Sequence, residues 1–198
     1  MTQQHTEPMT GHSNSLDAPM PVRRDLHFPF PPERILDWHG EGAYITQFFN
    51  TLSLYFPEGE KFFIQSVRHY KGQITDPVLQ QAVAGFIGQE AMHGREHRAF
   101  NALMEDAGLP ANRIEQFSLQ RLKMAHRIFS PARQLSMTIA LEHLTAIMAA
   151  DLLKNPAVLA GSHPDYARLW RWHALEETEH KAVAFDVWKT VMPNTLGS

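Results

Sequence analysis

The chain has 198 residues, of which 43% are apolar, and this is enough for one domain with a buried core. Its formal net charge is −3 and it contains no cysteine, so a disulfide framework and a thiolate metal site are excluded. Without an overall basic field, we expect no nucleic-acid partner, and composition does not indicate membrane association. The N-terminus lacks a cationic segment followed by an apolar run, which predicts a cytoplasmic protein.

The first 32 residues differ in composition from the rest of the chain. They contain six prolines and no sustained helical or strand periodicity, so we expect an extended or partly disordered N-terminal arm over residues 1–32. Residues 33–198 then form one helical domain. The chain ends in Gly197-Ser198, which leaves open whether a C-terminal part of the domain is missing.

Apolar residues recur at helical spacing from Glu33 to Phe56 and predict a first helix there. Pro57 interrupts this pattern. Because proline fits the first turn of a helix, we expect a new or kinked helix from Pro57, ending at Gly72. Asp76-Pro77 is typical of a helix start, and the helix that follows is predicted to reach Gly108.

The second half of the chain predicts three more helices. A weaker helix spans about 111–127, Ser130-Pro131 marks the next start, and a last long helix covers about 165–191. The segment 135–153 is apolar nearly all round, as in a membrane span, but Glu142 at its centre opposes insertion into a bilayer. We therefore expect a buried central helix there. No alternating strands or Gly-rich phosphate loops occur, so the predicted fold class is all-α.

Two segments place histidines and carboxylates on one helical face. His173, Glu177 and His180 stand at i, i+4 and i+7, within an arc of about 60° on a helix. Glu90 and His93 repeat the Glu-x-x-His spacing. A solvated, charge-rich face gives such spacings by chance, so the hypothesis of a metal site depends on partners elsewhere in the chain.

Such partners occur on two further helices. Glu142 is a carboxylate in an apolar helix and needs a cation or a hydrogen-bonded partner. Glu60 lies on the helix after Pro57, with Glu58 as an alternative. One carboxylate from each of two helices, with a Glu-x-x-His from each of two others, is the arrangement of ferritin-like bundles that bind two iron or manganese ions.

The sequence thus predicts an all-α, ferritin-like bundle with a site for two metal ions, with iron favoured and manganese or zinc as alternatives. Three nearby residues are candidates for contacts that support the ligands: His97, His143 and Glu176, of which Glu176 is also a rival to Glu177 as a ligand. The predicted ligands are Glu60, Glu90, His93, Glu142, His173, Glu177 and His180.

From about Ile35 to Lys189 the chain resembles the bacterial proteins grouped as predicted metal-dependent hydrolases. This resemblance implies a metal site more firmly than it implies a reaction. The spacing of His173, Glu177 and His180 also resembles the ligand set of di-iron arylamine N-oxygenases. The stretches that carry the family resemblance are Phe56–Phe63, Gln89–His97, Ala140–Ala146 and Trp172–Asp186.

Three functions are compatible with this site. We favour an O₂-dependent oxidase or oxygenase that acts on a small organic substrate with an electron donor, because His173 adds a third imidazole to the set. The alternative is a hydrolase that uses a metal-bridged hydroxide, for which Arg68, Arg95 and Lys181 are candidate substrate-binding cations. The third is a non-catalytic iron-binding protein. A homo-oligomer is compatible with all three.

Overall fold

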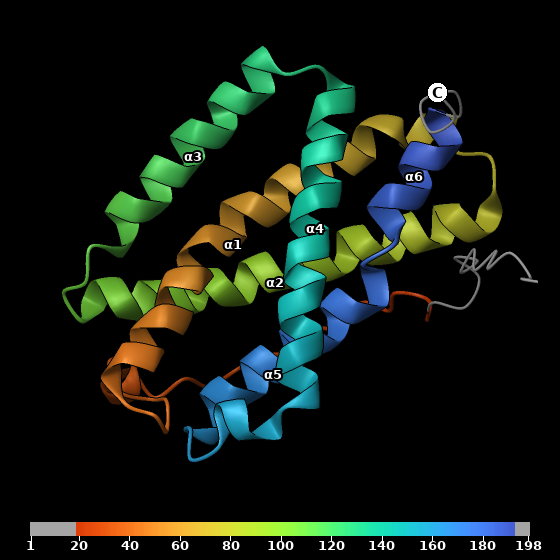
Figure 1. The fold of residues 1–198 in the computed structure, drawn as a ribbon. Coiled ribbons are helices and arrows are strands. Elements are labelled where there is room, and N and C mark those ends of the chain that lie inside the picture. The colour runs from red at the N-terminus through yellow and green to blue at the C-terminus, as the bar shows by residue number, and fades with distance from the viewer. Residues whose placement is uncertain (1–18, 193–198) are drawn as a thin grey trace, which may run out of the picture.

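The computed structural model describes residues 19–192, which contain helices and connecting segments but no β-strand. The predicted all-α class is therefore confirmed (Figure 1). The first 18 residues of the predicted arm, and residues 193–198, lie outside the described part of the chain. The helices are α1 (Ala43–Tyr70), α2 (Pro77–Asp106), α3 (Ala111–Ile128), α4 (Pro131–Lys154), α5 (Pro164–His180) and α6 (Val183–Val191), with short 3₁₀ turns η2 (Pro32–Arg34), η3 (Lys71–Gln73) and η4 (Pro156–Leu159).

The predicted starts of α2 and α4 are confirmed in atomic detail. The Asp76 carboxylate accepts a hydrogen bond from the Val78 N–H at 3.0 Å, and the Ser130 hydroxyl accepts one from the Arg133 N–H at 3.4 Å. Each capping residue is followed by a proline at the first helical position. These caps satisfy backbone donors that have no partner within the helix. The weaker helix predicted over 111–127 is also present, as α3.

The predicted start of the first helix is wrong by about ten residues. α1 begins at Ala43, because Gly42 before it has a φ of 86°, a left-handed conformation that a right-handed helix cannot continue. Ile35 and Trp38 are buried, but they lie in the segment before the helix. The Trp38 indole donates to the Asn50 side-chain oxygen at 2.9 Å. The apolar spacing of Ile35 and Trp38 therefore reflects burial of these side chains in the core, and it does not indicate a helix.

The structure decides between the two alternatives predicted at Pro57. Pro57 lies inside α1, so it does not start a separate helix, and the ribbon of α1 bends along its length, as in a kinked helix (Figure 1). One other predicted boundary differs. The helix predicted over 165–191 is divided into α5 and α6 at Lys181-Ala182. The division comes directly after His180 and lets α6 run in a different direction (Figure 1).

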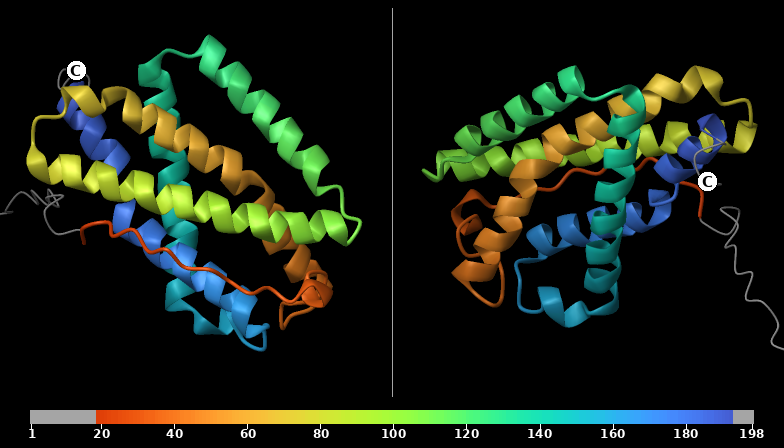
Figure 2. Two further views of the ribbon diagram at one scale, coloured as in Figure 1. Left: turned by 180° about the vertical axis from the view of Figure 1, so that it is seen from behind. Right: turned by 45° about the horizontal axis from the view of Figure 1, so that its top comes forward.

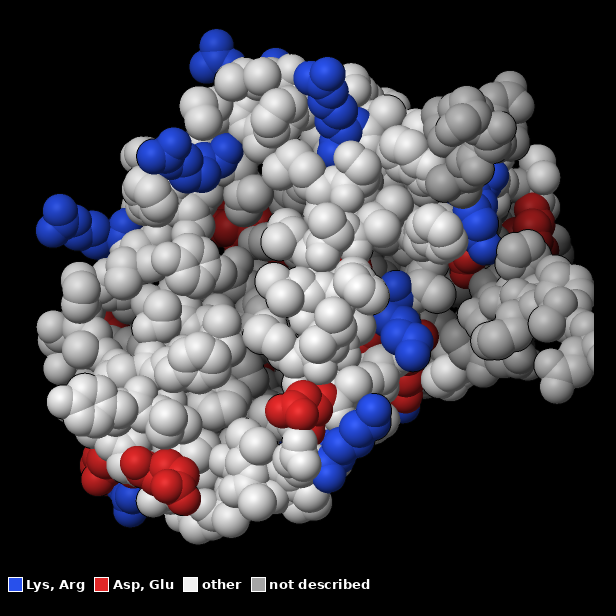
Figure 3. All heavy atoms as spheres, viewed as in Figure 1, with Lys and Arg blue, Asp and Glu red and all other residues white. Residues whose placement is uncertain are grey.

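The predicted burial of the helix over 135–153 holds for one face of α4 only. One face turns inward and includes Leu135 and Glu142, whereas Leu144 and Ile147 on the other face are 52% and 54% exposed. Figure 3 shows that much of this side of the molecule is uncharged. By length and composition α4 is the single helix among residues 19–192 that could cross a membrane, a test that the core helix of a soluble protein also passes.

The helices pack around two apolar clusters. One cluster is rich in aromatic side chains, including Trp38, Phe100 and Trp170, and the other includes Phe62 and Phe86. On α1 and α2, the predicted ligands lie between residues of the two clusters. On α5, they lie between residues of the aromatic cluster and the start of α6. The region that holds the ligands is therefore enclosed at both ends by apolar side chains.

The described part of the N-terminal arm, residues 19–31, runs without helix along the bundle. Figure 2 shows that it lies against α2 and α5, on the side of the molecule opposite α4. The Phe28 ring is buried in the aromatic cluster, and the Phe28 N–H donates to the Glu96 carboxylate at 3.2 Å. This part of the arm is thus a component of the packed structure.

Candidate metal centre

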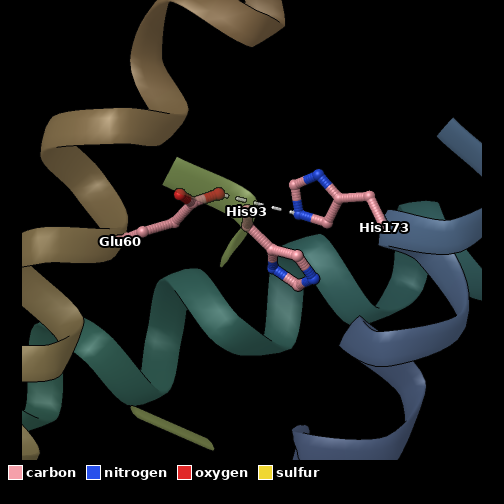
Figure 4. A group of neighbouring side chains, drawn as sticks. All are labelled: Glu60, His93 and His173. Atoms are coloured by element: carbon pink, nitrogen blue, oxygen red, sulfur yellow. Dashed lines mark ion pairs between the residues drawn. The ribbon is translucent and has the colours of Figure 1, made fainter. Parts of the chain in front are cut away.

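The predicted ligands come from α1, α2, α4 and α5, and every one of their side chains is buried. Figure 4 shows Glu60 of α1, His93 of α2 and His173 of α5 pointing toward one another. These three offer one ligand atom each within 4.8 Å of the others, and Glu90, Glu177 and His180 form a second such group. Glu142 of α4 lies beside the second group, with a carboxylate oxygen 3.4 Å from His180 Nε2.

Two carboxylates connect the groups. Glu177 Oε1 is 2.9 Å from His173 Nε2, 3.8 Å from His93 Nδ1 and 3.6 Å from His180 Nε2. Glu90 has one oxygen 3.0 Å from His180 Nε2 and the other 4.0 Å from His93 Nδ1. Glu60 is 3.8 Å from His173 Nε2. Carboxylates in these positions are suited to bridge two cations, each with its own imidazole ligands.

A chain of hydrogen bonds determines which nitrogen of His173 carries its proton. The Asn101 amide nitrogen donates to the Ser53 carbonyl and to Glu115, so its side-chain oxygen faces the Ser53 hydroxyl at 2.6 Å and accepts from it. Ser53 Oγ therefore accepts from His97 Nδ1 at 2.8 Å, and His97 Nε2 accepts from His173 Nδ1 at 2.7 Å. The lone pair of His173 consequently lies on Nε2, which faces Glu60 and Glu177.

Hydrogen bonds also determine which nitrogen of His180 is engaged on the outer side of the site. The Gln89 amide nitrogen donates to the Val22 carbonyl at 3.2 Å and to Glu179 at 2.7 Å, so its oxygen is the atom that accepts from His180 Nδ1 at 3.0 Å. Nδ1 therefore carries a proton, and Nε2, the nitrogen closest to Glu90, is the atom left to bind a metal. Without a metal, the negative charges of Glu142, Glu177 and Glu90 outweigh the effect of burial and raise the pKa of His180 above its usual value.

His93 is oriented by a carboxylate. Burial lowers the pKa of His93 well below its usual value, so the imidazole is neutral. Its Nε2–H donates to Glu176 Oε2 at 3.0 Å, and Nδ1 is left without a hydrogen-bond partner among the described residues. All three histidines thus turn the nitrogen that is not engaged by an outer hydrogen bond toward the carboxylates, which is the orientation of metal-bound imidazoles.

The carboxylates themselves lack donors. Both oxygens of Glu60, Glu90 and Glu142 have no hydrogen-bond partner in the described part of the chain, although all three side chains are fully buried. Burial raises the pKa of Glu60 and Glu142 well above the usual value, and like charge from neighbouring carboxylates adds to this. Buried carboxylates without hydrogen-bond donors are costly unless cations are bound beside them. The residues therefore fit two metal ions.

An outer polar network, which sequence reasoning missed, connects the arm to these histidines. The Arg24 guanidinium donates to Glu176 at 2.9 Å and to both oxygens of Glu179 at 2.8 and 2.7 Å. Glu176 orients His93, and Glu179 accepts from Gln89, which accepts from His180. The hydrogen bonds to Glu179 and Glu176 raise the pKa of Arg24. Its partners are 152 and 155 residues away, so no local pattern indicated this contact.

The three candidates for supporting contacts are placed differently. His97 lies directly behind His173, and Glu176 holds His93 from outside the ligand cluster. His143 is exposed on α4, so it does not support the site as expected. His143 lies about 100° from Glu142 around the helix axis, and Glu142 is the residue that faces the metal centre.

The comparison with protein families bears directly on this site. Residues 22–197 match the family model described as predicted metal-dependent hydrolase. The chain belongs to this family. The predicted resemblance is therefore confirmed, and the buried His and Glu groups agree with the metal dependence of the family. Neither the curated proteins nor the solved structures contain a significant match.

The family also corrects the predicted reaction. We expected oxygen chemistry because His173 adds a third imidazole, but the family is described as predicted metal-dependent hydrolases, and nothing in the comparisons supports an oxidase or oxygenase. The preference for an oxidoreductase is therefore wrong. A third imidazole is not specific to oxygen chemistry, since His₃ sites also hold the metal of hydrolytic and hydration enzymes. The alternative, metal-dependent hydrolysis, is better supported.

Proposed function

We propose that the protein is a hydrolase in which two divalent ions are held by Glu60, Glu90, His93, Glu142, His173, Glu177 and His180. The observation that carries the proposal is the set of three inward imidazole nitrogens, His93 Nδ1, His173 Nε2 and His180 Nε2, which face four buried carboxylates. When bound, a pair of divalent ions lowers the pKa of water and polarises the substrate oxygen.

The residues of the chain divide the remaining tasks. Glu90 and Glu177 hold the two positions at a fixed separation, because each contacts histidines of both groups. The Phe56 ring packs on His97 and His173, with centroids 4.8 and 4.6 Å apart, and keeps water from this side. In the overall reaction, the oxygen of water bonds to the acyl or phosphoryl centre, the bond to the leaving group breaks, and a proton of water passes to the leaving group.

The choice of ion is a separate part of the proposal. Nitrogen and carboxylate ligands suit iron, manganese and zinc alike, so the ligand set does not select among these ions. Four carboxylates and two divalent ions have formal charges that cancel. This balance supports occupation by two divalent ions.

The test is metal analysis of the full chain purified without chelator, followed by turnover assays on carboxylic esters, amides and phosphate esters. We expect about two ions per chain, hydrolysis of at least one substrate class, loss of turnover after chelation and recovery when the ion is returned. His180→Ala should lose both metal and turnover. A fully loaded protein that hydrolyses none of these classes would contradict the proposal.

A further inference from the structure

The α3 helix carries large apolar side chains on its outer face. It packs on α1 and α2, and the residues that it buries there are small: Ala111, Ser118 and Ala125. By contrast, Phe117, Met124 and Ile128 are 53%, 47% and 64% exposed. Their spacing of seven and four residues places them within about 40° of arc on a helix. These three side chains therefore form one apolar stripe that faces outward, which we call the outer stripe.

Cations flank the outer stripe. Around the helix axis, Arg113 and Arg121 lie about 40° to either side of Phe117, and a third arginine, Arg127, lies about 80° from it. All three arginines are exposed, and the Arg121 guanidinium lies 4.9 Å from the centre of the Phe117 ring. The one acidic residue of α3, Glu115, is half-buried and accepts a hydrogen bond from α2 at 2.6 Å. The outer face of α3 is therefore both apolar and positive.

This local charge differs from the net charge of −3 of the whole chain. Residues 111–133, from the start of α3 to the first turn of α4, contain five lysines and arginines but one acidic residue. Between Arg133 and Asp151, α4 has no charged residue except Glu142, which is buried. Figure 3 shows blue side chains over α3 and the start of α4 at the upper left, beside the uncharged surface of α4. The cations thus border an apolar surface.

We propose that this face of the molecule binds the surface of an anionic lipid bilayer. It consists of the outer stripe, the three arginines of α3 and the exposed apolar side chains of α4, Leu141, Leu144 and Ile147. The apolar side chains enter the boundary between headgroups and acyl chains, and the arginines contact lipid phosphates. Helices that lie in a membrane surface combine an apolar stripe with flanking cations in this way.

The bilayer is bound at its surface and is not crossed by α4. This helix is long and apolar enough to span a membrane, but Leu135 and Glu142 point into the bundle, where Glu142 lies beside His180. A spanning α4 would carry this carboxylate out of the bundle into hydrocarbon, which is costly. The outward side chains of α4 can contact lipid without any change in the packing of the helices.

The same face is less suited to a second copy of the chain. In a symmetric dimer the same patch of both subunits meets, so the arginines of one α3 would lie against those of the other. Like charges placed together oppose association, whereas an anionic surface neutralises them. Charge complementarity therefore favours lipid over self-association.

The first test is sedimentation of the full chain with two kinds of vesicle, one of phosphatidylcholine and one of an equal mixture of phosphatidylcholine and phosphatidylglycerol. We expect binding to the mixed vesicles and little binding to the neutral ones. High salt should weaken the binding, because it screens exposed charges. Equal binding to both kinds of vesicle, or binding to neither, would overturn the proposal.

A triple variant tests the three arginines. Arg113→Gln, Arg121→Gln and Arg127→Gln together should weaken binding to the mixed vesicles about 100-fold, because each cation close to an anionic surface contributes about fivefold. All three side chains are exposed, so the fold should be retained, and circular dichroism checks this. Unchanged binding by the triple variant would overturn the proposal.

A matched triple variant changes the net charge by the same amount on another side of the molecule. Arg23→Gln, Arg168→Gln and Arg171→Gln remove exposed cations of the arm and α5, and Arg168 lies over the Phe28 ring of the arm. The arm runs on the side opposite α4 (Figure 2). We therefore expect this variant to bind like the unsubstituted protein. An equal loss in both triple variants would show that net charge alone decides binding, and would overturn the proposed face.

A fluorescent label tests whether the outer stripe enters the bilayer. The chain has no cysteine, so Met124→Cys gives one site for a label whose emission depends on polarity. Its emission should rise and shift to shorter wavelength when mixed vesicles are added, whereas a label at Arg171→Cys on α5 should not respond. A response of the Met124 label to protein concentration alone, together with a dimer in sedimentation velocity, would overturn the proposal and assign the face to self-association.

Discussion

The two sides of the candidate metal centre differ in chemistry. On the side of the N-terminal arm, Arg24 is hydrogen-bonded to Glu176 and Glu179, and each histidine behind them has its outer nitrogen engaged. On the side of α1 and α4, a small cavity lined mostly by apolar side chains lies beside His173 and Glu177. The polar side engages the outer nitrogens of His93 and His180, so it holds these candidate ligands in place. The apolar side packs against the candidate ligands and makes few hydrogen bonds to them among the described residues.

The contrast between the two sides depends on a metal centre that lies between them. The largest effect is therefore expected from removal of a candidate ligand, Glu142. Glu142→Ala deletes the ligand from α4, and we expect metal content to fall from about two ions per chain to about one or fewer. Asp151→Ala is the control, because Asp151 is exposed near the end of α4 and accepts from Asn155. Metal content is measured after identical loading. Equal content in Glu142→Ala and the unsubstituted protein would argue against the centre.

The second prediction concerns the polar side. Arg24→Ala leaves Glu176 and Glu179 without their cation, so the groups that orient His93 and His180 lose their support. Loss of such outer contacts typically costs 10- to 100-fold in metal affinity, and we expect a loss of about that size in metal titrations.

Two matched variants sharpen this second prediction. Arg24→Lys should recover only part of the affinity, because an ammonium cannot replace the planar, bidentate guanidinium. Arg23→Ala changes the neighbouring residue, which is exposed and 3.8 Å from an exposed Asp25, and should have no effect. If Arg23→Ala and Arg24→Ala weaken metal binding equally, the arm would act only by covering the site.

The two sides also differ in how well they could be predicted. The candidate ligands could be predicted because spacings of i, i+3 and i+4 within a helix leave a local pattern, as in Glu90, His93, Glu177 and His180. The support from Arg24 left no such pattern, since it joins positions 152 and 155 residues apart.

The fold shows the same division between local and distant signals. Caps and prolines located the starts of α2 and α4, because capping depends on three or four consecutive residues. The start of α1 was misplaced because apolar spacing records burial in any conformation, and Trp38 is buried outside a helix. Composition likewise could not reveal which face of α4 other helices cover. His143 was therefore expected near the site, although it is exposed.

The third prediction tests the support of His173, which faces the apolar side. Ser53→Ala removes the hydroxyl between Asn101 and His97 and leaves two buried polar atoms unsatisfied, so we expect a loss of ~1–3 kcal/mol in the free energy of unfolding. Metal affinity should also fall several-fold, because the proton on His173 is no longer held on Nδ1.

Ser66→Ala is the matched control for this change. Ser66 is also a buried serine of α1 with two partners, the Phe63 carbonyl and the Thr138 hydroxyl, and neither bond belongs to the hydrogen-bond chain that ends at His173. Its loss should lower stability by ~1–3 kcal/mol without changing metal affinity. Chemical denaturation and metal titration of both variants separate the two effects. A change in metal affinity of the same size in Ser66→Ala would show that affinity follows stability alone.

The smallest effect is expected on the exposed surface of α4. His143 is adjacent to Glu142 in sequence, and its imidazole would be a good metal ligand, but it is exposed while Glu142 points inward. His143→Ala should therefore leave metal content, metal affinity and ester turnover unchanged, and unfolding free energy should change by less than ~0.5 kcal/mol. His97→Ala, the same substitution at a buried imidazole hydrogen-bonded to His173, should lower metal affinity. A loss of bound metal in His143→Ala comparable to that in His97→Ala would mean that α4 is rotated about its axis in the metal-bound protein, and that its exposed face contributes to the centre.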